Sequence, residues 1–114
     1  MKKKTQTTRM KFQKVRIVSS DYKITYHKII VENGQSLDGH IDEGDKEIKI
    51  LDSLNYQYEL QVILHEAIHG MKYEMRFDCD DGENMNVQLT TCFSCFIRDN
   101  PEFIMEYMRI LNGG

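Results

Sequence analysis

The sequence predicts an α+β fold, in which a small antiparallel β-sheet is followed by three helices. Over residues 12–51 apolar and polar residues alternate in short runs separated by turns, which is the pattern of half-buried strands. After Ser53 the apolar residues recur every three or four positions, which is the pattern of helices packed on one side. A chain of 114 residues can bury one hydrophobic core, so we expect one compact domain.

The N-terminal residues form a basic segment that contains Lys2, Lys3, Lys4, Arg9 and Lys11. No apolar run of the kind found in a signal peptide follows it, and no stretch of the chain is long and apolar enough to span a bilayer. We therefore expect a flexible tail over residues 1–11, a single domain over residues 12–114 and no membrane partner. The formal net charge of -3 argues against a nucleic-acid partner.

Strands are expected in three places in the first half of the chain. Residues 14–18 alternate, residues 22–27 are rich in aromatic and β-branched side chains, and residues 46–51 alternate again. Short polar residues and Gly between these runs favour turns. Residues 40–51 predict a hairpin whose tip is the polar run 42–45.

Three helices are expected in the second half. The first covers residues 55–76 with Asp52 or Ser53 as its cap, the second covers residues 83–97, and the third begins at Asn100 and Pro101 and ends near residue 111. The predicted apolar stripe of the first helix consists of Leu60, Leu64, Ala67, Met71 and Met75. The residues expected to close the core from the later helices are Phe93, Phe96, Phe103 and Met108.

The most informative motif lies in the middle of the first helix, where His65, Glu66 and His69 form the pattern HExxH. Two His four residues apart project from one face of a helix, so their imidazole nitrogens can bind a single ion. With His65 at zero, His69 lies at about 40° and Glu66 at about 100° around the helix axis, away from the apolar stripe at about 240°. The spacing predicts a Zn²⁺ site that includes His65 and His69.

Glu66 lies beside the predicted site, turned enough to reach a water bound to the metal instead of the metal itself. Zinc lowers the pKa of its water to about 7 and polarises a carbonyl, while a neighbouring carboxylate takes the proton and passes it to the leaving amine. The motif therefore predicts a zinc metallopeptidase with Glu66 as its catalytic base. The alternative interpretation is a pair of His residues on the surface or in the core without a metal.

A catalytic zinc needs a third protein ligand and an open fourth position. Glu83 is the favoured candidate, because it opens the second helix, which can fold back against the first. Asp80 and Asp81 compete with it, although a solvated acidic turn is the simpler explanation of both, and a site without a third protein ligand stays open. Glu74 is a poor candidate, because it lies at about 180° from His65 on the same helix.

Together these features resemble the zincin metallopeptidases, in particular the gluzincin type and small HExxH proteins of phages and prophages that are similar to ImmA/IrrE-like peptidases. The resemblance covers residues 22–110 and rests on the hairpin strand Glu47-Ile48-Lys49-Ile50, the HExxH motif, Glu83 and residues 98–103, of which HExxH alone is strongly specific.

The resemblance implies a zincin-like fold with zinc ligands His65, His69 and Glu83 and with Glu66 as general base. It also implies that the strand containing Ile48 offers its edge to an extended peptide or protein substrate. We expect a cytoplasmic protein, in a bacterium or a phage-infected host cell. The candidates for stabilising the oxyanion are His40, Tyr56, Tyr58 and Tyr73.

Two other interpretations remain open. In the first, His65 and His69 join Cys92 and Cys95 in a closed His₂Cys₂ structural zinc site, which has no open position for chemistry. Against it, thiols within a helical run most often pack as apolar residues. In the second, the chain is a zincin-like regulatory or assembly partner without catalysis, although a site that only binds metal does not need Glu66.

Overall fold

Strands and helices follow one another along the chain in the predicted order. The computed structural model describes residues 9–76 and 82–113. Its elements are β1 (Lys14–Ile17), β2 (Ser20–His27), β3 (Val31–Glu32), β4 (Gln35–Ser36), β5 (Gly39–Asp42), β6 (Glu47–Leu51), α1 (Tyr56–Met75), α2 (Gly82–Asp99) and α3 (Pro101–Leu111). The predicted α+β class and the hairpin of β5 and β6 are confirmed.

The main sheet is mixed, so the prediction of an antiparallel sheet was wrong. Its strand order is β1-β2-β6-β5, with antiparallel pairs on the two outer sides and the parallel pair of β2 and β6 in the centre. After β2 the chain passes through the small β3–β4 hairpin and enters β5 at the outer edge of the sheet. There β5 has the direction opposite to that of β2. The following hairpin then folds β6 into the space between them. Alternation identifies a strand but not its neighbours, which packing decides.

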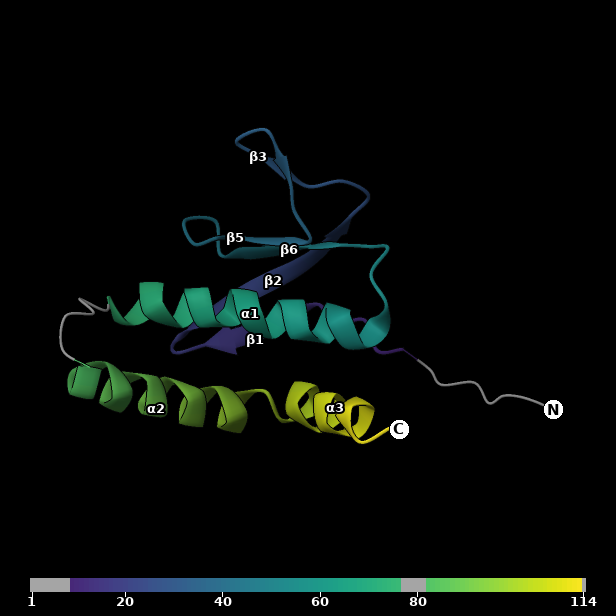
Figure 1. The fold of residues 1–114 in the computed structure, drawn as a ribbon. Coiled ribbons are helices and arrows are strands. Elements are labelled where there is room, and N and C mark those ends of the chain that lie inside the picture. The colour runs from purple at the N-terminus through teal and green to yellow at the C-terminus, as the bar shows by residue number, and fades with distance from the viewer. Residues whose placement is uncertain (1–8, 77–81, 114) are drawn as a thin grey trace.

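One face of the main sheet is covered by α1, and α2 and α3 lie beside α1 (Figure 1). The apolar residues of α1 that are completely buried are Leu60, Ile63, Ala67 and Met71, while Leu64 and Met75 of the predicted stripe are partly buried. The strand residues that face them in the core are Val15, Ile17, Tyr22, Ile24, Ile41, Ile48 and Ile50. The recurrence of apolar residues in α1 thus predicted its core face correctly, although the centre of that face lies closer to Ile63 than predicted.

The ends of α1 agree with the prediction within one residue, but its cap differs. The side chain of Asn55 accepts a hydrogen bond from the backbone N–H of Tyr58, so Asn55 is the N-cap instead of Asp52 or Ser53. At the other end Arg76 has a left-handed backbone with φ of 54°, which terminates the helix. Among the described residues no helix is long and apolar enough to cross a membrane.

Phe residues of α2 and α3 close the core beside β1. Phe96 and Phe103 are buried, and their ring centroids lie 5.9 Å apart, while Phe93 is partly buried. Met108 is 56% exposed, so its assignment to the core was wrong. Met108 follows Phe103 by five positions, which turns it by about 140° around α3 and away from the core.

The end of the predicted tail packs against the domain. The guanidinium of Arg9 donates a hydrogen bond of 2.9 Å to the carboxylate of Glu59, and the ammonium of Lys11 lies 3.6 Å from the same carboxylate. The backbone N–H of Met10 donates to the hydroxyl of Tyr56. Glu59 is completely buried and attracts these cations, so the packed part of the chain already includes Arg9. Residues 1–8 of the predicted tail lie outside the described residues.

Candidate metal centre

A groove lies between the outer strand β5 and α1, and the HExxH motif contributes to its wall. The groove has a volume of about 220 Å³ and is lined by Leu37, Asp38, Gly39, Tyr58, Gln61, Val62, His65 and Glu66. Gly39 allows β5 to approach α1 closely, because a Cβ atom on Gly39 would lie 2.5 Å from Cγ1 of Val62. Five of the lining residues belong to α1, and four of them follow Tyr58 by three, four, seven and eight positions, so they share one face of that helix.

His65 and His69 are exposed, and their side chains lie next to each other on α1. The centroids of the two rings are 5.0 Å apart, with an angle of 73° between the ring planes. Two imidazoles that bind one tetrahedral zinc through Zn–N bonds of about 2.0–2.1 Å have centroids about 5 Å apart. The separation of the two rings is therefore that of two imidazoles on one ion, and both side chains are open to solvent.

Glu66 is 8% exposed and lies between α1 and the backbone of β5. Burial raises the pKa of the Glu66 carboxyl above its ordinary value, and His69, His65 and His40 partly oppose this increase. Its Cγ atom would be 3.5 Å from a Cβ on Gly39, so the strand limits the space around this side chain. A carboxylate held in this environment accepts a proton more readily than one in water.

The described residues do not provide a complete set of three ligands. Within residues 9–76 and 82–113, no group of three or more His, Cys, Asp or Glu side chains is arranged to hold a metal ion. Glu83 is exposed in the first turn of α2 and lines a separate surface depression with Asn86 and Val87. Asp80 and Asp81 lie outside the described residues. The separation of the two imidazoles is compatible with one shared ion, while zinc binding and the third ligand stay predictions.

Glu74 takes part in a structural cluster, in agreement with its predicted place on another side of α1. Its carboxylate accepts hydrogen bonds from Ser20 and Tyr22 on β2, and it contacts the ammonium of Lys46. These hydrogen bonds fasten the C-terminal part of α1 to the sheet.

The structure places Cys92 in the core, where it is 1% exposed, and it places Cys95 in a half-buried position. Burial raises the pKa of the Cys92 thiol, and neighbouring Cys95 raises it further. Neither thiol belongs to a group of metal-binding side chains within the described residues. Cys92 therefore packs as an apolar residue, and the structure does not join the two Cys to His65 and His69.

The strand edge beside the motif belongs to β5, so the expectation that the Ile48 strand offers its edge was wrong. Ile48 lies in β6, which is paired with β2 on one side and with β5 on the other. The sequence predicted the hairpin but not which of its two strands is outermost. That depends on which strand pairs with β2, and a local pattern does not record this pairing.

Asp38 and Gly39 line the groove, although their sequence predicted only a turn. Tyr58 was one of four candidates for stabilising the oxyanion, and it is the one that lines the groove among the described residues. Its spacing of seven residues from His65 is the signal that places it on the same helix face.

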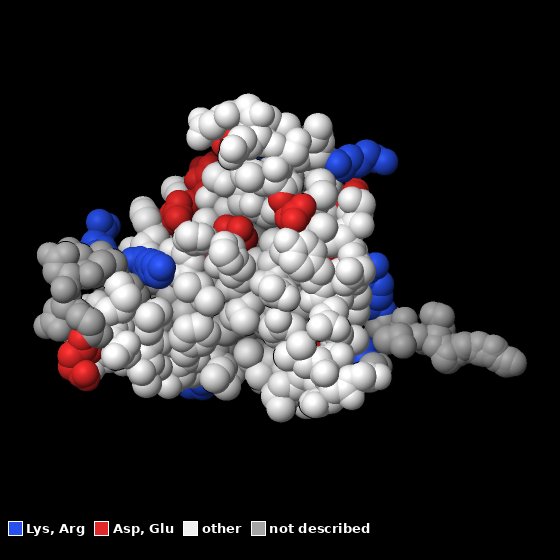
Figure 2. Space-filling view, viewed as in Figure 1, with Lys and Arg blue, Asp and Glu red and all other residues white. Residues whose placement is uncertain are grey.

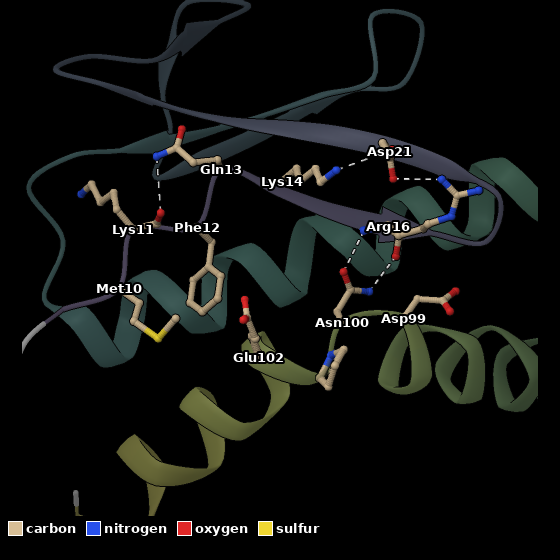
Figure 3. Close-up of a pocket in the computed structure, with 11 residues that line it drawn as sticks. Met10, Lys11, Phe12, Gln13, Lys14, Arg16, Asp21, Asp99, Asn100 and Glu102 are labelled. Atoms are coloured by element: carbon tan, nitrogen blue, oxygen red, sulfur yellow. Dashed lines mark hydrogen bonds and ion pairs between the residues drawn. The ribbon is translucent and has the colours of Figure 1, made fainter.

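A larger cavity of about 600 Å³ lies beside β1 and contains no residue of the HExxH motif. Figure 3 shows the side chain of Asn100 directed at the backbone of Arg16 in this strand. The backbone N–H of Arg16 donates to Oδ1 of Asn100, and Nδ2 of Asn100 donates to the carbonyl of Arg16, both at 2.8 Å. Asn100 thus pairs with the edge of β1 as a peptide group does.

Comparison with known proteins gives no relative from which a role can be transferred: the chain matches no family model, no curated protein and no solved structure. The chemistry of the groove must therefore be argued from its own residues.

Proposed function

We propose that this protein is a zinc-dependent peptidase of the zincin type, whose active site is the groove between β5 and α1. His65 and His69 bind the metal, Glu66 is the catalytic base, and the predicted third ligand is Glu83. The observation that carries the proposal is the combination of two exposed imidazoles with centroids 5.0 Å apart and a buried carboxylate next to His65. A pair of His residues without a catalytic role has no need of a buried Glu between them.

The outer edge of β5, which pairs with no other strand of the described residues, supports a peptide as the substrate. The backbone N–H of Leu51 donates to the carbonyl of Asp38, so this opposed pair is hydrogen-bonded. In an antiparallel ladder, successive residues of one strand direct their backbone N–H and C=O groups alternately toward and away from the partner strand. Because those of Asp38 point toward β6, those of Gly39 and Ile41 point away from it. An extended peptide can pair with these groups and place its own carbonyl beside Glu66.

The chain's own residues account for the proton transfers. Zinc, when bound, supplies a Lewis acid that lowers the pKa of a water to about 7 and polarises the carbonyl under attack. The carboxylate of Glu66 accepts a proton from the attacking water and then donates it to the nitrogen of the leaving amine. Burial restricts the side chain of Glu66, so it remains in position for both transfers.

Substitution of Glu66 by Gln tests this function most directly. Glu66→Gln keeps the shape of the side chain but removes its basicity, so we expect zinc content to stay at the parent level and peptide hydrolysis to fall by about 10²- to 10⁴-fold. Zinc is measured by elemental analysis of the purified protein, and hydrolysis with a library of fluorescence-quenched peptides. His65→Ala is expected to lose both zinc and activity.

Glu102→Gln is the matched control, because Glu102 is an exposed residue of α3 that does not line the groove. It removes the same charge and should hydrolyse peptides at the parent rate. A Glu66→Gln variant that is as active as the parent would exclude Glu66 as the base. A parent protein that binds zinc but cleaves no peptide would instead indicate a zinc-binding module without catalysis.

A further inference from the structure

Asp38 places a carboxylate at the opening of the groove. Its Oδ2 atom accepts a hydrogen bond of 2.8 Å from the hydroxyl of Tyr58 on α1, and its main-chain carbonyl accepts one of 2.9 Å from the N–H of Leu51 on β6. These hydrogen bonds join Asp38 to α1 through its side chain and to β6 through its backbone. Because Asp38 is exposed and lines the groove, its charge is available to a ligand that enters there.

Among the described residues, no cationic side chain pairs with the carboxylate of Asp38. None of the eight residues that line the groove is Lys or Arg. On the face shown in Figure 2, acidic side chains gather above α1, over the strands, while Lys and Arg lie at the margins. The groove therefore presents negative charge to a ligand.

The other walls of the groove suit a long cationic side chain. Leu37, Val62 and the ring of Tyr58 form apolar surface next to Asp38. Lys and Arg carry an aliphatic stem that packs on such a surface and a charged head that reaches a carboxylate. The face of a Tyr ring also attracts a cation.

The helix fixes how far this charge lies from the proposed reaction. Tyr58 precedes His65 by seven residues, which is about 10 Å along the axis of α1. An extended peptide advances by about 3.3 Å per residue, so about three residues span this distance. A side chain of the bound peptide that contacts Asp38 therefore belongs to a peptide residue about three positions from the peptide group next to Glu66.

We propose that the groove between β5 and α1 selects peptides with a Lys or Arg side chain, which binds to Asp38 within about three residues of the peptide group beside Glu66. The position of the cleaved bond rests on the proposed peptidase function. The tighter binding of peptides that carry a Lys or Arg side chain does not depend on that function. An ion pair at a partly exposed groove gives a preference of about fivefold, and salt weakens it.

The test measures peptide binding and cleavage separately. A series of labelled peptides carries one Lys at successive positions, and matched peptides carry Ala or Glu there. Binding to the zinc-containing Glu66→Gln protein is followed by fluorescence anisotropy, and cleavage by the parent is followed by mass spectrometry. We expect Lys peptides to bind about fivefold more tightly than Ala peptides, and Glu peptides to bind more weakly than either.

Asp38→Asn in the same Glu66→Gln protein is the decisive variant, because Asn can still accept the hydrogen bond from Tyr58 but lacks the charge. We expect it to abolish the preference for Lys over Ala, while Glu102→Gln keeps that preference. Equal binding of Lys and Ala peptides, or a preference that survives Asp38→Asn, would overturn the proposal. If the preference holds but the parent cleaves none of the peptides, the binding site stands and the peptidase function fails.

Discussion

At the scale of single residues, the approach of β5 to α1 depends on Gly39. A Cβ atom at this position would lie 2.5 Å from Cγ1 of Val62 and 3.4 Å from the carbonyl oxygen of Lys49. Val62 is β-branched and restricted in χ1, so it cannot turn away at low cost. The absence of one methyl group at Gly39 therefore keeps the edge of β5 beside Glu66.

Gly39→Ala is expected to lower the free energy of unfolding by about 1–3 kcal/mol, since an added methyl group overpacks the contact with Val62. Val62→Ala removes the clashing atom. The double variant Gly39→Ala/Val62→Ala should thus be at least about 1 kcal/mol more stable than the sum of the single changes predicts. Urea unfolding of the four proteins measures this coupling, and strictly additive changes would show that Val62 does not limit the approach.

At the scale of elements, the cluster around Glu74 joins the end of α1 to β2 and to the turn before β6. Burial alone raises the pKa of Glu74, but hydrogen bonds from Lys46, Tyr22 and Ser20 outweigh it and leave the pKa below its ordinary value. Burial and the hydrogen bond to Glu74 in turn raise the pKa of Tyr22. A carboxyl with a lowered pKa stabilises the fold while it is ionised.

The contribution of Glu74 should therefore depend on pH. It is fully present above the pKa of an unfolded Glu, about 4.3, and it is lost as the pH falls through the lower pKa of the folded protein. Glu74→Gln is expected to lower the free energy of unfolding by about 1–3 kcal/mol at pH 7. The difference from the parent should shrink below about pH 4, as measured by urea unfolding across pH. A difference that stays constant down to pH 3 would contradict this role.

At the scale of the whole molecule, the segment before β1 connects α1 with α3. Arg9 binds the buried carboxylate of Glu59 on α1. The hydroxyl of Tyr56 accepts a hydrogen bond from Met10 and donates one to Glu106 of α3, whose carboxylate also pairs with an Arg of the same helix. Phe12 of the same segment packs against Phe103 of α3, with ring centroids 5.3 Å apart, so the segment contacts both helices.

Arg9→Ala is expected to lower the free energy of unfolding by about 1–3 kcal/mol, because the buried carboxylate of Glu59 loses its hydrogen-bonded cation. Adding Glu59→Gln should recover part of this loss, since the buried charge is then absent. Arg98→Ala is the control, because its side chain is 69% exposed, and it should change stability by less than about 0.5 kcal/mol. Equal melting temperatures for Arg9→Ala and Arg98→Ala would show that the segment does not stabilise the fold.

Local periodicity accounts for most of what could be predicted. The backbone geometry of a strand or a helix repeats every two or 3.6 residues, so alternation identified the hairpin of β5 and β6, and the recurrence of apolar residues identified α1, α2 and α3. The same geometry put His65 and His69 on one face of α1, and their ring separation of 5.0 Å agrees with that expectation.

Long-range packing decided the rest, because no local pattern records which elements meet. The parallel pairing of β2 with β6 and the outer position of β5 depend on where the chain returns after the β3–β4 hairpin. The groove exists because Gly39 and Val62, far apart in the sequence, come into contact there. Only that contact brings Asp38 beside Tyr58, His65 and Glu66 of α1, and with it the charge that we propose selects the ligand.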